Sequence, residues 1–246
     1  MKKGEFVIRR NERLTETVFR LVLGGDTTAL TAPGQFAELQ LPEFFLRRPF
    51  SVCDWDEESM TILYKVVGNG TRQLSEYGIG KKIDALVGLG NGFDVSACAG
   101  RTLVIGGGIG AAPMFALAKR LLKSGKQPTA ILGFNTADEI FYEDEFRALG
   151  VKTIVATADG SRGVHGFVTD ALPDDFDMFC ACGPMPMLRA LAGTAKKPGY
   201  MSLEARMGCG FGACMGCTIQ TAGGPRRVCK DGPVFRKEEL LWEAHA

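Results

Sequence analysis

The first 97 residues alternate apolar and polar positions in short runs, the pattern of strands that bury one face. Clusters of glycine, proline and aspartate separate the runs at residues 6–8, 18–23, 36–41, 60–67 and 83–87. Strands of this length joined by turn residues predict an antiparallel β unit that closes into a small barrel. Residues 71–77 lack the alternation and follow a glycine-rich turn, so we expect one short helix there.

From residue 101 to about 193 the pattern changes to apolar strands followed by helical stretches. Strands are predicted at 102–105, 129–134, 152–156 and 178–181, and helices at 113–122 and 139–149. This alternation predicts a parallel sheet with crossover helices. A last strand at 200–203 precedes a region rich in glycine and cysteine, and the chain ends in a charged, helix-like tail.

Composition excludes several classes of protein. The chain has 246 residues, 46% hydrophobic and 23% charged, with a net charge of +1, so neither intrinsic disorder nor a general attraction to nucleic acid is expected. Its longest uncharged apolar run, residues 103–118, is shorter than the ~20 residues of a membrane span, and no signal peptide follows the basic start. We therefore expect a cytoplasmic protein without membrane or nucleic-acid partners.

Four of the eight cysteines form a cluster near the C-terminus. Cys209, Cys214, Cys217 and Cys229 have the spacing C-x4-C-x2-C-x11-C, which matches the plant-type ferredoxin pattern for a [2Fe-2S] centre. Interleaved glycines let the backbone wrap closely around such a cluster. The alternative is a zinc site with four cysteines, but such sites usually pair two C-x2-C knuckles and only one is present here.

Two turns at the ends of predicted strands are candidates for nucleotide binding. Residues 103–105 lead into the glycine turn at 106–113, and the strand at 178–181 ends in Cys182, Gly183 and Pro184. Ligands bind at this carboxyl edge of open α/β sheets, although glycine turns also serve plain packing. In the β region, residues 47–51 place arginine, phenylalanine and serine together, which suits an aromatic cofactor that bears phosphate.

Taken in order, these parts resemble the ferredoxin reductase family and, within it, the electron transfer subunits of class 1B dihydroorotate dehydrogenases. The similarity rests on R-R-P-F-S, G-N-G-T, G-L-G-N-G-F, S-L-E-A-R-M-G-C-G-F-G-A-C-M-G-C and R-V-C-K-D-G-P-V-F, and it covers essentially the whole chain. The resemblance implies a FAD-binding β-barrel domain at 1–98, an NAD-binding α/β domain at 99–200 and a small [2Fe-2S] domain at 201–246.

The resemblance also implies the residues of each site. The FAD site would comprise Arg48, Pro49, Phe50, Ser51, Leu63, Tyr64, Lys65, Gly70 and Thr71. Within it, Arg48 would face the pyrophosphate, Phe50 the isoalloxazine and Ser51 its N5 region. The NAD side would comprise Gly106, Gly107, Gly108, Gly110, Ala111, Cys182, Gly183 and Pro184. The cluster would be held by Cys209, Cys214, Cys217 and Cys229.

The expected function is an electron relay between NAD and a partner through FAD and a [2Fe-2S] cluster. The two histidines lie in surface-like contexts and neither is expected to be catalytic, so no base for abstracting a substrate C–H proton is evident. The resemblance implies that dihydroorotate is oxidised by a separate catalytic subunit containing FMN, joined with this chain in a heterotetramer. We expect that partner to dock around residues 207–217, unless Met207, Phe211 and Met215 pack onto this chain's own domains.

Two alternative functions remain open at this point. The chain could be an NAD(P)H-dependent, ferredoxin-type reductase subunit of another redox complex, or a non-catalytic zinc-binding module. NADH is expected to be preferred over NADPH, because residues 134–144 contain four carboxylates and no arginine or lysine.

Overall fold

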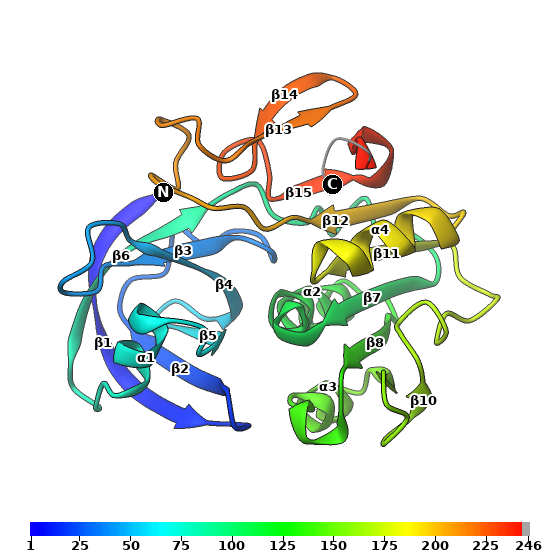
Figure 1. Cartoon of the computed structure of the whole chain (residues 1–246), viewed down its shortest axis with the longest axis horizontal. Coiled ribbons are helices and arrows are strands. Elements are labelled where there is room, and N and C mark those ends of the chain that lie inside the picture. The colour runs from blue at the N-terminus through cyan, green and yellow to red at the C-terminus, as the bar shows by residue number, and fades with distance from the viewer. Residues whose placement is uncertain (243–246) are drawn as a thin grey trace.

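The computed structural model describes residues 1–242 and begins with a closed antiparallel barrel. Its strands are β1 (Lys2–Arg13), β2 (Val18–Gly24), β3 (Phe36–Leu39), β4 (Arg48–Trp55), β5 (Ser59–Lys65) and β6 (Lys82–Leu89), in the order β1-β2-β5-β4-β3-β6 (Figure 1). Alternate side chains such as Phe6, Ile8 and Leu21 fill the interior, which confirms the predicted barrel. The short helix α1 (Asn69–Ser75) begins two residues before the predicted one.

The second half is an α/β sheet of seven strands in the order β10-β9-β8-β7-β11-β12-β15. Its strands are β7 (Thr102–Gly107), β8 (Thr129–Phe134), β9 (Lys152–Thr157), β10 (Val164–His165), β11 (Met178–Cys182), β12 (Gly199–Ser202) and β15 (Val234–Arg236). The first six run parallel, as predicted, but β15 pairs antiparallel with β12. The C-terminal region thus completes one edge of the sheet.

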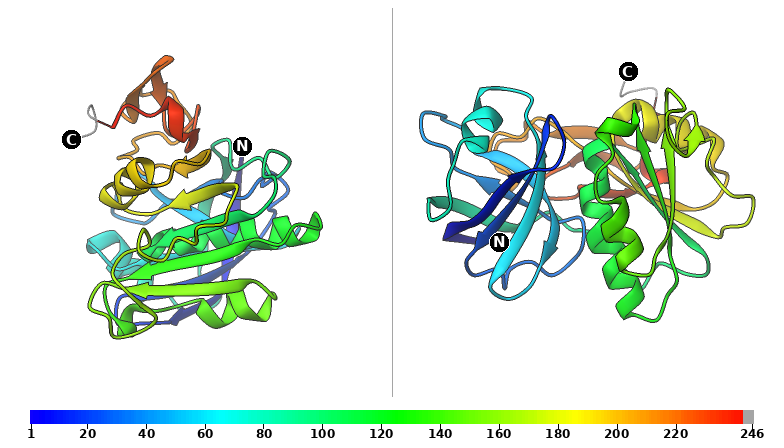
Figure 2. Two further views of the ribbon diagram at one scale, coloured as in Figure 1. Left: turned by 90° about the vertical axis from the view of Figure 1, so that its right-hand side faces the viewer. Right: turned by 90° about the horizontal axis from the view of Figure 1, so that it is seen from below.

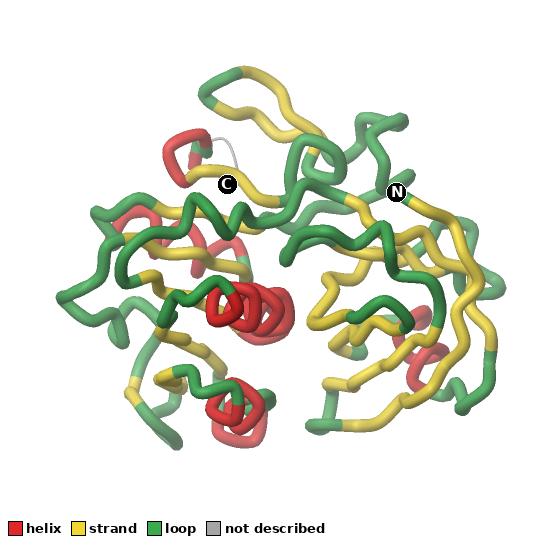
Figure 3. Tube along the Cα trace, turned by 180° about the vertical axis from the view of Figure 1, so that it is seen from behind, coloured by secondary structure: helices red, strands yellow, loops and turns green. Residues whose placement is uncertain are grey.

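Helix α2 (Ala111–Lys123) lies between the sheet and the barrel (Figures 1 and 3). Its small and apolar side chains face both layers, and most of them are buried. At its outer end Lys119 forms an ion pair with Asp54 of β4, and the Arg120 guanidinium lies 4.5 Å from the Trp55 ring. These contacts help to fix the barrel against the sheet.

The two remaining α-helices differ from the sequence pattern. The predicted helix at 139–149 is wrong in its bounds, because the backbone turns left-handed at Tyr142 (φ 64°) and separates the turn η2 (Ala137–Glu139) from α3 (Glu143–Ala148). Helix α4 (Met185–Thr194), which the sequence pattern did not predict, places Leu188 and Leu191 against the face of the sheet opposite α2 (Figure 2).

The C-terminal region contains little regular structure. After β12 the chain forms an irregular loop, the hairpin β13 (Thr218–Thr221) and β14 (Gly224–Arg227), then β15. In place of the predicted helix-like tail, the structure has the single 3-10 turn η3 (Lys237–Glu239). The last part of that prediction, residues 243–246, lies outside the described residues. Within residues 1–242, none of the helices has the length and apolar character that crossing a bilayer requires.

Candidate functional site

A cavity of about 400 Å³ lies where the barrel meets the carboxyl edge of the sheet. Strands β4 and β5 form one wall, the glycine turn and the end of β11 form the second, and the segment that follows β12 closes the third. Its lining includes these predicted residues: Arg48, Pro49, Phe50, Ser51, Leu63, Tyr64, Lys65, Thr71, Gly110 and Cys182. The fold therefore brings together two groups of predicted residues that are far apart in the sequence.

The barrel wall of the cavity combines aromatic, apolar and hydroxyl groups. The rings of Phe50 and Tyr64 meet edge to face, with centroids 5.9 Å apart. The Tyr64 hydroxyl donates a hydrogen bond to Asn11 Oδ1 (3.0 Å), and burial raises the pKa of this phenol. Its ring can therefore line the cavity while its polar end is satisfied inside the barrel.

Arg48 lies at the outer end of this wall, beside the start of α1. Its guanidinium is 4.7 Å from the Phe44 ring and donates to the Leu46 carbonyl (2.7 Å). A Cβ atom added to Gly70 would come within 3.1 Å of Arg48 Nε, so the absent side chain leaves the cation room. Its neighbour Arg47 instead pairs with Asp84 of β6. Of the two arginines, only Arg48 lines the cavity.

The predicted Gly70–Thr71 pair has a more limited role in the structure. The Thr71 hydroxyl accepts from the amide of Val67 (2.9 Å) and donates to the carbonyl of Gly68 (3.1 Å). Thr71 therefore fixes the entry of α1 with its polar atom and borders the cavity.

On the sheet side, the two predicted turns pack against each other. A Cβ atom on Gly110 would lie 2.2 Å from the Cys182 carbonyl oxygen, and one on Gly107 would lie 2.3 Å from Met187 Sδ. Only glycine permits this approach. Gly108, by contrast, has φ +51° and faces open space. The turn therefore presents exposed backbone where a phosphate could approach, while Gly106 and Ala111 pack together behind it.

Cys182 and Glu204 are two titratable groups of the cavity lining whose pKa values are raised. The Cys182 side chain is buried, which raises the pKa of its thiol to about 12. Desolvation also raises the pKa of the Glu204 carboxyl. The thiol is thus a neutral group on the nicotinamide side, and the carboxyl keeps its proton to a higher pH than an ordinary glutamate does.

The third wall of the cavity contains residues that sequence reasoning did not assign. Ser202, Leu203, Glu204, Ala205 and Met207 line it, and elsewhere in the cavity the unassigned lining residues are Phe36, Val67, Ile109 and Pro233. The motif S-L-E-A-R-M was visible in the sequence but gave no sign that it faces the barrel. Two residues after Met207 the chain reaches Cys209, so one continuous segment joins the cavity to the cysteine cluster.

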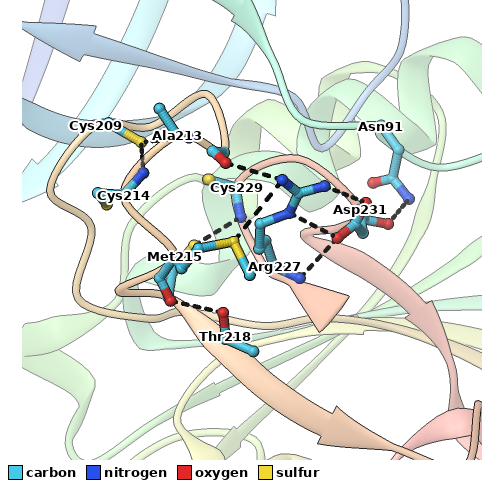
Figure 4. Close-up of polar contacts among 11 residues, drawn as sticks. Asn91, Cys209, Ala213, Cys214, Met215, Thr218, Arg227, Cys229 and Asp231 are labelled. Carbon is cyan, nitrogen blue, oxygen red and sulfur yellow. Dashed lines mark hydrogen bonds and ion pairs between the residues drawn. The ribbon is translucent and has the colours of Figure 1, made fainter. Parts of the chain in front are cut away.

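The four cysteines of the cluster motif lie close together as two pairs. In each pair the backbone amide of one cysteine donates to the other thiol: Cys214 to Cys209 Sγ, and Cys229 to Cys217 Sγ (3.4 Å each). Backbone amides point at the sulfur atoms: Cys209 Sγ accepts from the amides of Ala213 (3.2 Å) and Cys214 (3.4 Å), as Figure 4 shows. Desolvation would raise the pKa of Cys209, but backbone amides and the Cys214 thiol lower it to about 6.

This donor set fits a two-iron cluster better than a single zinc ion. Two thiol pairs supply two ligands for each of two irons, and amides directed at sulfur favour the thiolate form. Gly208 and Gly216 lie against Cys214 Sγ, where a Cβ atom would be 3.3 and 3.6 Å away.

A buried carboxyl lies beneath this cluster loop. Glu38 of β3 is 1% exposed, and neither of its carboxylate oxygens has a hydrogen-bond partner among the described residues. A Cβ atom on Gly210 would overlap it at 2.3 Å, so the loop backbone sits directly on the carboxyl. Burial first, and the nearby Cys209 second, raise the pKa of Glu38 to about 7.

Comparison with known proteins identifies two families along the chain. Residues 204–241 match the iron-sulfur cluster binding domain of dihydroorotate dehydrogenase B, and residues 104–193 match the oxidoreductase NAD-binding domain. The first match contains Cys209, Cys214, Cys217 and Cys229, and the second contains the glycine turn and the end of β11.

Relatives and solved structures extend the similarity over the whole chain. The electron transfer subunits of dihydroorotate dehydrogenase B (NAD(+)) from Bacillus mycoides (strain KBAB4) and Bacillus cereus (strain G9842) are 42% and 43% identical, over 98% of this chain and 99% of theirs. A structure described under NADH-dependent reduced ferredoxin-NADP oxidoreductase superposes with a TM-score of 0.89 at 33% identity, covering 97% of this chain and 90% of that one.

More distant structures share the fold. A ferredoxin NADP+ reductase from Neisseria gonorrhoeae superposes with a TM-score of 0.69 at 16% identity, covering 79% of this chain and 90% of that one. The predicted fold, a β barrel followed by an α/β sheet and an iron-sulfur region, is confirmed. By its full-length similarity to the Bacillus proteins, the chain belongs to the family of electron transfer subunits of dihydroorotate dehydrogenase B.

Proposed function

We propose that this chain relays electrons between NAD and the catalytic subunit of a dihydroorotate dehydrogenase, through FAD in the cavity and a [2Fe-2S] cluster on the four cysteines. The main support is the continuous segment from Ser202 to Cys209, which lines the cavity and then supplies the first thiol of the cluster. Met207 and Cys209 are two residues apart, at most ~7 Å along the chain. Electrons leaving the cavity would therefore have a short path to the cluster.

The residues of the cavity would bind and orient the cofactors. Arg48 would neutralise the FAD pyrophosphate, Phe50 would pack on the ring system, and Ser51 would hydrogen-bond its N5 edge. The glycine turn and the end of β11 would place the nicotinamide against the opposite face. FAD bound in this way supplies the exchange between a two-electron hydride and single electrons. Glu204 would hold the accompanying proton on its carboxylate.

A second polypeptide would oxidise dihydroorotate, since the relatives are described as electron transfer subunits of the dehydrogenase. The cluster loop is the expected contact with it: Phe211 and Met215 are 45% and 53% exposed. Met207 instead packs against the chain's own core and lines the cavity, so the expectation of an exposed Met207 is not met. We further propose a heterotetramer with the FMN-containing subunit in the cytoplasm, a compartment suited to the eight unpaired cysteines.

Spectroscopy and reconstitution test this function. The purified chain should contain FAD, iron and acid-labile sulfide, and should show flavin and iron-sulfur absorption that NADH bleaches. Replacing any one of Cys209, Cys214, Cys217 or Cys229 by Ser should remove the cluster absorption, whereas Cys53→Ser should retain it. A chain isolated with zinc and without flavin would contradict the proposal.

A second candidate is a reductase subunit that serves ferredoxin in another complex. The structure described under NADH-dependent reduced ferredoxin-NADP oxidoreductase supports it, with 33% identity over nearly the whole chain. Co-purification from the native cell discriminates between the two: the first candidate expects an FMN-containing dihydroorotate dehydrogenase subunit, the second a different flavoprotein partner.

A further inference from the structure

The loop that bears the cluster cysteines has a positive φ angle on both sides of Cys214. Gly212 has φ +91°, which glycine adopts freely, whereas Met215 has φ +63°, in the left-handed region that is strained for a residue with a side chain. Such a conformation persists only where neighbouring groups fix it. The contacts that fix this loop therefore also determine where the thiols lie.

One arginine contacts the loop on both sides of Cys214. Arg227, at the end of β14, donates through Nη1 to the Gly212 carbonyl (2.9 Å), and the same nitrogen lies 3.9 Å from Met215 Sδ (Figure 4). Its side chain is 25% exposed, so the guanidinium is largely enclosed beside the loop. Thr218 fixes the Met215 carbonyl with its amide (3.1 Å) and its hydroxyl (2.6 Å).

Asp231 holds this arginine in place. Its Oδ2 accepts from the Arg227 amide (2.8 Å) and from Nε (3.2 Å), and its side chain is 22% exposed. The Asp231 carbonyl accepts from Asn91 Nδ2 (3.3 Å), and Asn91 also bonds the amide and carbonyl of Val234. A chain of hydrogen bonds thus runs from the segment after β6 to the cluster loop.

We propose that Arg227 is a positioning residue whose guanidinium also raises the reduction potential of the cluster, and that Asp231 limits this effect. The inference rests on the proposed function, because it requires a [2Fe-2S] centre on the four cysteines. Reduction adds one negative charge to the cluster, and a fixed cation stabilises that charge more than it stabilises the oxidised form. The carboxylate of Asp231 opposes the cation. Arginine stays protonated, so the effect does not depend on pH.

Substitutions of Arg227 and Asp231 distinguish an electrostatic effect on the reduction potential from a structural effect on the loop. In Arg227→Gln the ratio of reduced to oxidised cluster at a fixed ambient potential should fall about tenfold, or ~59 mV in midpoint for one electron. Asp231→Asn keeps the shape, exposes the cation and should shift the midpoint in the opposite direction. Arg227→Lys keeps the charge but not the bidentate geometry, so its midpoint should lie between those of Arg227→Gln and the natural protein.

The experiment is a redox titration of the full-length holoprotein followed by electron paramagnetic resonance, with iron and sulfide measured on each variant. Arg226→Gln is the matched control, because Arg226 is exposed on the same strand, and its midpoint should stay unchanged. An unchanged midpoint in Arg227→Gln, or shifts of one sign in both Arg227→Gln and Asp231→Asn, would overturn the inference.

The experiment also gives a decisive result if a variant fails to bind the cluster. If Arg227→Gln binds no cluster, Asp231→Asn decides, and an unchanged midpoint there overturns the electrostatic role. Absence of iron and sulfide from the natural protein would contradict the proposed function itself, and is thereby distinguished from failure of the inference.

Discussion

Arg48 is the side chain on which we expect FAD affinity to depend most. Its guanidinium lies at the end of the cavity beside Gly70, where a phosphate could form a charge-assisted hydrogen bond. Such a bond contributes roughly 1.5–3 kcal/mol, so Arg48→Ala should raise the dissociation constant of FAD about tenfold to 150-fold. Fluorescence titration of the flavin-free protein measures it.

Arg47→Ala is the matched control for this substitution. Arg47 is the adjacent arginine, but it pairs with Asp84 and is absent from the cavity lining. Its removal should leave FAD affinity within about twofold. Equal losses in both variants would mean that the two arginines act through general charge, and Arg48 would have no specific place in the site.

Glu38 should make stability depend on pH. Folding raises the pKa of its carboxyl from 4.5 to about 7 by burial, so the unfolded chain ionises first as pH rises. Stability is unaffected below pH 4.5, falls between about 4.5 and 7, and is then lower by at most about 3 kcal/mol. Glu38→Gln cannot ionise and should flatten this part of the profile.

Thermal unfolding at pH 5 and pH 8 measures the effect of Glu38. The comparison uses the pH difference within each protein, so any uniform cost of burying the glutamine amide cancels. If the natural protein and Glu38→Gln lose the same stability between the two pH values, the carboxyl is not the group that titrates.

Among the elements, the contact between the glycine turn and the end of β11 should control NADH binding. A Cβ atom at Gly110 would overlap the Cys182 carbonyl at 2.2 Å, so Gly110→Ala must push the two turns apart. We expect the KM for NADH to rise at least tenfold while FAD content is retained. Gly193→Ala is the control, because Gly193 lies in the last turn of α4 with nothing within 4 Å of an added Cβ. Similar kinetics in both variants would remove the contact from the site.

The turn after β8 bears on cofactor choice. Residues 134–144 contain Asp138, Glu139, Glu143 and Asp144 and no basic residue to meet a 2′-phosphate. Glu139 already accepts from the amide and the side chain of Asn135 (3.2 and 2.8 Å). We expect kcat/KM for NADH to exceed that for NADPH at least tenfold in an acceptor-reduction assay. Equal values would show that this turn does not select the cofactor.

Local patterns predicted most of the elements, and the failures have physical causes. Most of the barrel strands and parallel strands were predicted because each buries one or both faces with a regular period, whereas the two-residue strand β10 was missed. The helix at 139–149 failed because a left-handed residue, Tyr142, interrupts a continuous helical pattern. The hairpin β13–β14 was missed because its strands contain mostly polar residues and glycine, and bury little.

The candidate site was predicted only where one short motif contained its chemistry. The four cysteines and the R-P-F-S segment can be recognised in the sequence by their residue types and spacing. Glu204 and Glu38 do not, because their significance comes from contacts between segments far apart in the sequence. The role of Arg227 likewise depends on its hydrogen bond to the Gly212 carbonyl. The spacing of the cysteines does not specify the path of the loop that brings these two residues together.

At the scale of the whole molecule, we expect the isolated chain to reduce artificial acceptors with NADH but not to oxidise dihydroorotate. Adding the FMN subunit should restore NAD-dependent oxidation. Phe211→Asp should weaken that restoration at least tenfold, because Phe211 is 45% exposed in the loop where the partner is proposed to dock.

Phe167→Asp serves as the control for docking. Phe167 is 68% exposed but lies in the segment after β10, outside the cluster loop. Iron content and acceptor reduction are measured in both variants, so loss of the cluster is distinguished from loss of docking. Turnover of dihydroorotate by the chain without its partner would contradict the division of labour.

The antiparallel pairing of β15 with β12 limits how this chain can be divided or recombined. Residues 234–236 return from the iron-sulfur region and cover an edge of the sheet that would otherwise present unpaired amides and carbonyls. Truncation of the chain after β12 would therefore remove more than the iron-sulfur region. It would leave β12 as an unpaired edge strand, which is prone to self-association. The cysteine region therefore cannot be exchanged as a separate domain, because β15, which follows it, belongs to the sheet. A chimera that keeps β15 paired with β12 should remain monodisperse.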